Sequence, residues 1–187
     1  MKRVVLRLIV PLFLLFLILL SVKVGYDRAI TLDENVKNAW AQLQNQLKRR
    51  YDLIPNLVGA VRGYAAHEKE IFEALGEART RYFGAKDTRE KIDASREIES
   101  QLSRLLMLVE RYPELKANEA FLRLQDALEG TENRISVERK RYNDAVRELN
   151  RFARSFFGRF FARLAGVGMA PYYDIPEAEK SRPEVKF

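Results

Sequence analysis

The sequence contains no cysteine, and this absence removes a whole group of functions. Disulfide bonds, thiolate metal sites, thiol nucleophiles and a lipid-modified cysteine anchor are all excluded. Glycine and proline are scarce, with 9 and 6 among 187 residues, so neither a loop-rich nor a disordered profile fits the chain. Instead, 47% hydrophobic and 32% charged residues are typical of a protein built from long helices.

Histidine is almost absent, which removes most catalytic and metal-binding motifs. The one histidine, His67, has Tyr64 three residues before it, so the Glu-x-x-His motif of a diiron bundle is missing. The stretch HEKE lacks the second histidine of a metalloprotease motif, and no glycine-rich phosphate loop or G-x-S-x-G elbow occurs. We predict a protein without enzymatic activity, metal or cofactor; the less favoured alternative is an enzyme that uses His67 as a base.

The net charge of +7 raises the question of a nucleic-acid partner. The basic residues alternate with Glu and Asp at helical spacing, as in EARTRYFGAKDTREK, and no basic arm or nucleic-acid motif is present. This pattern is typical of a solvated helix face. We therefore expect no nucleic-acid partner.

The N-terminal segment contains a long apolar run, from Leu8 to Val22. This run rises only ~22 Å as a helix, whereas the hydrocarbon core of a bilayer is ~30 Å thick. A span therefore requires Val4 to Val24, with Arg7 and Lys23 reaching outward to the headgroups. We predict a single N-terminal transmembrane helix over residues 1–25.

Two features of the sequence bear on the fate and orientation of this segment. The residues that follow it, SVKVGYD, fit a cleavage site poorly, which favours a retained anchor over a cleaved signal peptide. The positive charges before the span outnumber Lys23 and Arg28 after it, which by the positive-inside bias places the N-terminus in the cytoplasm. The remainder of the chain is then expected outside the cytoplasm.

Residues 26–157 show the periodicity of four amphipathic helices. The first apolar stripe runs from Tyr26 to Tyr51 without Gly or Pro, as a continuation of the N-terminal helix. Asp52 is expected to cap a second helix that has Pro55 in its first turn and reaches Gly84.

Two further caps are predicted along the chain. Asp87 with Glu90 resembles the capping box of a third helix, which runs until Pro113, and Asn118 is expected to cap the fourth. Four such helices with short connections predict an all-α fold, an antiparallel up-and-down four-helix bundle that follows the transmembrane helix.

The fourth predicted helix carries apolar residues at intervals of seven, from Phe121 to Phe156. Its stretch LEGTENRI places polar residues where a helix prefers Ala or Leu. We expect a polar layer in the bundle core, where close approach of a neighbouring backbone would offset the ~1 kcal/mol that Gly130 costs in a helix. The layer either controls the register of the helices, which is favoured, or forms a ligand or partner site. Its residues are Gly130, Thr131, Asn133 and Glu138.

Two stretches resemble a known family. RRYDLIPNLVGAVRGYAAHEKE, residues 49–70, and YPELKANEAFLRLQDALEGTENRISVERKRYNDAV, residues 112–146, closely resemble the LemA family of bacterial membrane-anchored helical proteins. The resemblance implies a four-helix bundle behind a single span in the bacterial inner membrane. It implies no established biochemical activity, and it implies envelope proteins, with membrane proteases among them, as suspected partners.

The family pattern falls on the end of the first predicted helix, which is a candidate partner site at the far tip of the bundle. An exposed charge run is equally often a solvated turn without a partner, and that alternative carries the same weight. The residues of this candidate tip are Lys48, Arg49, Arg50, Tyr51, Asp52, Pro55 and Asn56.

After Arg154 the sequence departs from the family pattern, and this segment is a candidate membrane-surface contact. Aromatic residues cover about half of the helical circumference and arginines the rest, which suits an interfacial helix over anionic headgroups. The equal alternative is that the aromatic residues cap the bundle core. The candidate contacts are Arg154, Phe157, Arg159, Phe160, Phe161, Arg163 and Leu164.

The predicted tail covers residues 158–187 and ends in YYDIPEAEKSRPEVKF, which is either an extended strap or a recruitment peptide. The sequence as a whole predicts a non-enzymatic, single-pass membrane module that acts as a scaffold or adaptor in the bacterial cell envelope. Its expected partner is an unidentified envelope protein. The alternative is a self-assembling structural protein of the membrane surface, in which a homo-oligomer forms.

Overall fold

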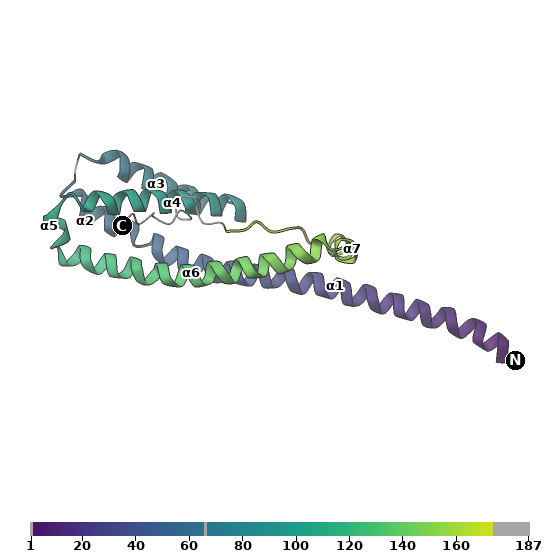
Figure 1. The fold of residues 1–187 in the computed structure, drawn as a ribbon. Helices are drawn as coiled ribbons and strands as arrows, with labels where there is room; N and C mark the ends of the chain where they lie inside the picture. Colours follow the sequence, from purple (N-terminus) through teal and green to yellow (C-terminus); the bar gives the residue numbers. More distant parts are fainter. Residues whose placement is uncertain (1, 66, 174–187) are drawn as a thin grey trace, which may run out of the picture. The chain divides into compact units, whose positions relative to one another are not determined.

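The computed structural model describes residues 2–65 and 67–173, with side chains from residue 11 onward in these ranges. They form helices joined by short connections, with no strand among them, so the prediction of an all-α fold is confirmed (Figure 1). The chain divides into two compact units, residues 1–40 with 141–170 and residues 41–140 with 171–187. The helices are α1 (Lys2–Tyr51), α2 (Ile54–Arg62), α3 (Lys69–Gly84), α4 (Thr88–Val109), α5 (Pro113–Lys116), α6 (Glu119–Arg154) and α7 (Phe156–Leu164).

α1 is a single helix of 50 residues. The predicted continuation of the first apolar stripe from the N-terminal segment is therefore confirmed, as expected for a stretch without an interior glycine between Tyr26 and Tyr51. In the described part of the chain, no helix carries an apolar stretch long enough to cross a membrane. The predicted span begins at Val4, outside the residues whose side chains are described.

The second predicted helix is wrong as a single element. α2 ends at Arg62 with Gly63 as its C-cap, and α3 begins only at Lys69. Gly63 disfavours continuation because glycine loses the most backbone entropy in a helix. Asp52 does not cap α2, since it instead forms an ion pair with Lys48 at 2.7 Å.

The predicted caps of the next long helices are confirmed. Asp87 Oδ1 accepts a hydrogen bond from the Glu90 backbone N–H at 2.8 Å at the start of α4. Asn118 Oδ1 accepts hydrogen bonds from the Ala120 and Phe121 backbone N–H groups at 2.9 and 3.1 Å at the start of α6. These side chains satisfy donors that a helix leaves unpaired in its first turn.

Unit 1, residues 1–40 and 141–170, packs α1 beside the end of α6 (Figure 1). The ring of Trp40 lies 5.2 Å from that of Tyr142 between centroids. Burial of apolar side chains from both helices stabilises this pair by the hydrophobic effect. The buried residues are Ala29, Leu32, Val36, Tyr142, Val146 and Leu149.

α7 ends in a tight turn that returns the chain to α6. Gly166 has a φ of 68°, and the Val167 N–H donates to Ala162 O at 2.8 Å, the bond pattern of a Schellman motif. Beyond this turn, Asn150 Nδ2 donates to Ala170 O at 2.9 Å, and Asn150 Oδ1 accepts from Ala170 N at 3.0 Å. The paired bonds fix the segment after α7 against α6.

Unit 2, described over residues 41–65, 67–140 and 171–173, contains α2 to α5 with the end of α1 and most of α6. α3 and α4 form an antiparallel hairpin with an ion pair between Arg81 and Glu97. The single up-and-down four-helix bundle of the sequence prediction is not confirmed. The core residues include Leu43, Leu47, Leu57, Leu75, Ile98, Leu102, Phe121, Leu128 and Ile135.

Replacement of glycine by alanine is expected to have opposite effects on the free energy of unfolding at two positions. A Cβ at Gly130, within α6, would meet nothing within 4 Å, so Gly130→Ala is expected to raise the free energy of unfolding by about 0.5–1 kcal/mol. Gly166→Ala is expected to lower it by about 1–2 kcal/mol, because its φ of 68° strains an L residue. Urea unfolding of the full-length chain in detergent, followed by circular dichroism, measures both; destabilisation by Gly130→Ala would instead indicate a close neighbour.

Candidate functional site

The predicted partner tip at the end of α1 is not exposed as a whole. The prediction is wrong for Arg50 and Tyr51. The Tyr51 side chain is fully buried, and only 12% of the Arg50 side chain is exposed. Tyr51 turns inward because it continues the buried stripe of Leu43 and Leu47 at intervals of four residues. The exposed members of the predicted tip are Lys48, Arg49, Asp52, Pro55 and Asn56.

Tyr51 connects the end of α1 to α3. Its ring meets that of Tyr82 edge-on, with centroids 4.8 Å apart and an interplanar angle of 80°. Arg79 Nε donates to the Tyr51 backbone carbonyl at 3.1 Å, which satisfies an acceptor that the end of the helix leaves open. Burial raises the pKa of Tyr51 well above its ordinary value and that of Tyr82 to about 12, so both hydroxyls stay protonated at neutral pH.

The predicted polar layer of α6 does not lie in the core, and that prediction is wrong. Gly130 and Asn133 are exposed, while Thr131 and Glu138 are half-buried. Thr131 Oγ1 donates to Leu128 O within its own helix at 2.7 Å. Because each residue turns the helix by about 100°, Gly130 lies about 200° around the axis from the buried Leu128.

Another residue of the same stretch, Glu132, does make long-range contacts. Its carboxylate forms an ion pair with Arg50 at the end of α1 and lies 3.9 Å from Arg139 Nη2 on α6. The two arginine side chains are only 12% and 11% exposed. Glu132 therefore joins two nearly buried cations, although the sequence pattern did not distinguish it from its neighbours.

Four buried polar side chains meet in unit 2, and we call them the Tyr173 cluster: Ser95 and Glu99 of α4, Arg139 of α6, and Tyr173. The Tyr173 hydroxyl donates to Glu99 Oε1 at 3.1 Å and lies 2.7 Å from Ser95 Oγ. The Arg139 guanidinium lies 5.7 Å from the centroid of the Tyr173 ring, within range of a cation–π interaction.

The Tyr173 cluster bears on the alternatives for the C-terminal tail. A fully buried Tyr173 side chain with two hydrogen-bonding neighbours ties this part of the chain to α4, which agrees with a strap. The rest of the predicted strap or recruitment peptide, residues 174–187, lies outside the described residues.

The electrostatics of the cluster depend on Glu99. Burial raises the pKa of its carboxyl, because an ion is poorly solvated there, while Arg50 and Arg139 act in the opposite direction. Burial also raises the pKa of Tyr173, and the neighbouring Glu99 raises it further. The cluster thus holds a neutral phenol beside a carboxyl group that is ionised with more difficulty than usual.

The sequence analysis missed Ser95, Glu99 and Arg139, although α4 carries a signal that points to the first two. Ser95 and Glu99 continue the spacing of the apolar positions Ile92 and Leu102, so they occupy the buried face of the helix. Polar residues at core positions require hydrogen-bonding partners. The identity of these partners depends on long-range packing, about which the periodicity of the sequence carries no information.

Among the described residues, no three His, Cys, Asp or Glu side chains converge to hold a metal ion. His67 is exposed in the connection between α2 and α3. What the Tyr173 cluster can do chemically is bind or release one proton at Glu99 while holding a chain segment in place.

α7 exposes most of the predicted membrane-surface residues. Phe157, Phe160 and Leu164 are 72%, 60% and 52% exposed. Arg154, Arg159 and Arg163 are also exposed, whereas Phe161 is half-buried. The alternative in which the aromatic residues cap a core is therefore wrong for Phe157 and Phe160, and also for Phe156, which is 87% exposed.

Comparison with known proteins places these features in a family context. The profile of the LemA family matches residues 39–187, a range that includes the exposed tip residues, the Tyr173 cluster and α7. Protein LemA of Metamycoplasma hominis is 23% identical over 175 residues, which cover 90% of this chain and 80% of that protein.

Removal of one hydroxyl tests the Tyr173 cluster. Tyr173→Phe is expected to lower the free energy of unfolding by about 1–3 kcal/mol, because Glu99 and Ser95 lose a buried hydrogen-bonding partner. Tyr172→Phe is the matched control, since the neighbouring side chain is 40% exposed and its variant should stay near the wild type. Urea unfolding of the full-length chain measures both, and equal stability of the two variants would contradict the role of the cluster.

The buried Glu99 is expected to make the difference in stability between the wild type and Glu99→Gln depend on pH. Because burial raises its pKa in the folded state, its ionisation lowers the free energy of unfolding as pH rises through the folded-state pKa. Glu99→Gln lacks this ionisation. The stability of the wild type relative to Glu99→Gln should therefore be greatest in acid and fall toward neutral pH, as measured by urea midpoints at several pH values. A relative stability that increases with pH would mean that Arg50 and Arg139 dominate over burial.

Proposed function

This chain belongs to the LemA family, and from that premise we propose that it is a non-enzymatic, membrane-anchored helical module that acts as a scaffold or adaptor in the bacterial cell envelope. In this proposal residues 1–25 form a single-pass anchor in the inner membrane. The N-terminus lies in the cytoplasm, and the helices that follow lie outside it, in agreement with the positive charges before the apolar run.

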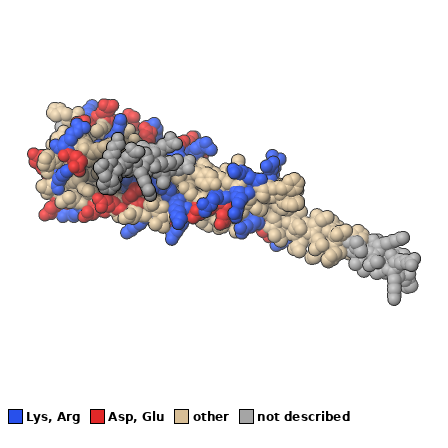
Figure 2. Space-filling model, in the orientation of Figure 1, with Lys and Arg blue, Asp and Glu red and all other residues tan. Residues whose placement is uncertain are grey.

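The exposed surface of α1 supports the anchor. Every residue from Leu12 to Leu20 is a large apolar residue, and their exposed fractions lie between 40% and 68%. In Figure 2 this part of α1 is a surface without charged side chains. A contiguous apolar patch of this kind is unfavourable in water and is stabilised by transfer to hydrocarbon.

The observation that carries the proposal is the exposure of α7. A helix in a water-soluble protein normally buries its apolar face, but α7 leaves Phe156, Phe157, Phe160 and Leu164 exposed. Residues 149–173 contain four arginines and no Asp or Glu. Apolar side chains beside arginines, in a segment without acidic residues of its own, are the combination that binds a bilayer surface with anionic lipids.

The scaffold role rests on the part of unit 2 that combines a fixed backbone with exposed polar groups. Tyr51 fixes the end of α1 in the core, while Arg49, Pro55 and Asn56 next to it remain exposed. Such an arrangement presents a preorganised surface to an envelope protein, for which a membrane protease is a candidate. Self-association into a homo-oligomer is the second candidate, and the exposed Leu122, 44% exposed, and Val137, 51% exposed, of α6 favour it.

The absence of cysteine permits a direct test of the membrane contact, because a single introduced thiol is unique. Phe160→Cys in the full-length chain should react slowly with a water-soluble maleimide in native membranes and rapidly after detergent is added, since the bilayer surface covers α7. Ser103→Cys, at an exposed site on α4 that belongs to neither proposed surface, should react rapidly in both conditions. Equal rates for the two thiols in membranes would refute the proposal.

The partner is tested by photo-crosslinking in cells. A photoreactive amino acid at Arg49 or Asn56 should give a discrete adduct with one foreign envelope protein, identified by mass spectrometry. A probe at Glu77, which is exposed on α3, serves as the control for adducts that depend on exposure alone. Adducts only with a second copy of this chain would replace the adaptor by self-assembly, and identical adducts from all three positions would argue against a specific surface.

A further inference from the structure

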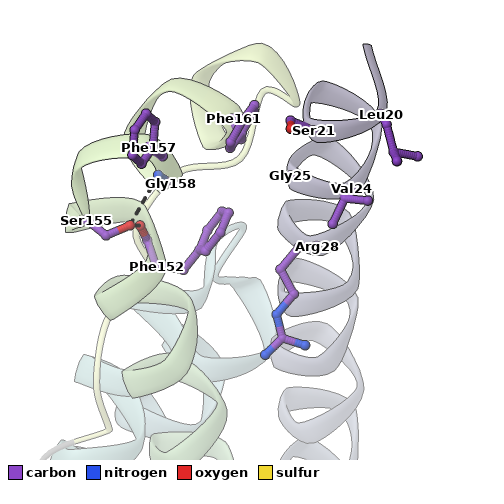
Figure 3. A pocket seen from close by; sticks show the side chains of 10 residues that line it. All are labelled: Leu20, Ser21, Val24, Gly25, Arg28, Phe152, Ser155, Phe157, Gly158 and Phe161. Carbon is purple, nitrogen blue, oxygen red and sulfur yellow. Dashed lines mark hydrogen bonds between the residues drawn. The ribbon is translucent and has the colours of Figure 1, made fainter. Parts of the chain in front are cut away.

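Unit 1 contains a cleft between α1 on one side and the end of α6 with α7 on the other (Figure 3). Its volume is about 630 Å³, which is typical of small-molecule sites. Leu20, Ser21, Val24 and Gly25 line the cleft from α1, and Phe152, Phe157 and Phe161 line it from α6 and α7. The lining is therefore predominantly apolar.

Both walls of the cleft are fixed by contacts of the protein itself. Ser155 Oγ accepts from the Gly158 N–H at 3.2 Å and lies 2.8 Å from Phe152 O, to which it donates. These bonds hold the turn between α6 and α7. On the other side Phe161 packs directly on the backbone of α1 at Gly25, where a Cβ would overlap the ring. The shape of the cleft thus does not depend on an occupant.

One end of the lining carries a cation. Arg28 is the charged residue among the described residues that line the cleft, and it forms no ion pair with a described carboxylate. Lys23, five residues earlier on the same helix, is by contrast paired with Asp27 at 3.1 Å. A guanidinium forms strong, often bidentate bonds with phosphate oxygens. An anionic group attached to an apolar chain would complement this lining.

The position of Arg28 matches the depth of a lipid headgroup. Arg28 lies four residues beyond Val24, the end of the proposed span, and therefore ~6 Å further along the helix. The polar layer on each side of a bilayer is roughly 5–7 Å thick. In the other direction, Leu20 and Val24 continue without a break into the exposed apolar residues from Leu12 onward. The cleft thus runs from headgroup level toward the hydrocarbon.

We propose that this cleft binds one anionic phospholipid from the membrane around α1. Its phosphate is held by Arg28, and one acyl chain lies along the apolar part of the lining. This site rests on the proposed membrane anchor, because the lipid enters from the surrounding bilayer. The cleft would thus bind one lipid molecule specifically, whereas the exposed surface of α7 contacts bilayer lipids without selecting among them.

Native mass spectrometry of the full-length chain in mild detergent tests the site. The chain is titrated with phosphatidylglycerol and with phosphatidylcholine of the same acyl chains. The wild type should form a one-to-one adduct with phosphatidylglycerol at about tenfold lower lipid concentration, because of the charge-assisted bond to Arg28. Arg28→Gln should abolish this preference, and Ser21→Phe, which places a ring in the cleft, should weaken both adducts.

Two variants of the same helix serve as controls. Lys23→Gln removes a cation and Thr31→Phe adds a ring, both at exposed positions outside the cleft, and both should bind like the wild type. Equal binding of the two lipids by the wild type, or an undiminished adduct in Ser21→Phe, would overturn the proposal.

The same variants separate this inference from the proposed function. Arg28→Gln and Ser21→Phe, each combined with Phe160→Cys, should keep the thiol protected in native membranes. If the thiol stays protected but the cleft variants do not change the lipid adducts, the lipid site is rejected and the membrane contact is retained. A reactive thiol in the otherwise wild-type chain would reject the membrane contact itself.

Discussion

The interior of unit 2 must accommodate a carboxyl group, and much of its architecture follows from how Glu99 is satisfied. An unpaired buried charge would destabilise the fold by several kcal/mol. Here a phenol donates to the carboxylate, and two guanidinium groups, from Arg50 and Arg139, stand near enough to oppose the effect of burial. Glu99 therefore couples groups from the end of α1, from α4, from α6 and from the segment at Tyr173. Loss of any one of these groups makes the interactions of the remaining ones less favourable.

Local signals allowed the sequence to predict most helix boundaries. Asp87 and Asn118 were recognisable as caps because the bonds they make reach only two or three residues along the chain. The break after Gly63 was missed, since the apolar stripe continues through Tyr64 in the sequence while the residue itself is 43% exposed. Periodicity alone does not distinguish a continuous helix from two helices whose stripes coincide.

The candidate sites were harder to predict because they depend on which face of a helix meets another segment. Tyr51 was correctly placed on the apolar stripe and yet also assigned to an exposed tip, although one side chain cannot occupy both positions. Gly130 and Asn133 were assigned to the core from their neighbourhood in the sequence, while the buried polar groups are Ser95 and Glu99. A partner such as Tyr173, separated from Glu99 by 74 positions, leaves no local trace.

The contact of Phe161 with Gly25 restricts α1 in a way that its length alone would not. A rotation of α1 by one residue turns the helix by about 100° and brings a side chain to the place now occupied by bare backbone. The flanking residues are Val24 and Tyr26, and either would push the Phe161 ring away. Within unit 1, the packing of Phe161 on Gly25 thus disfavours a twist of α1 about its own axis. Because only glycine leaves room for the Phe161 ring, Gly25 fixes the rotational setting of α1 against α7.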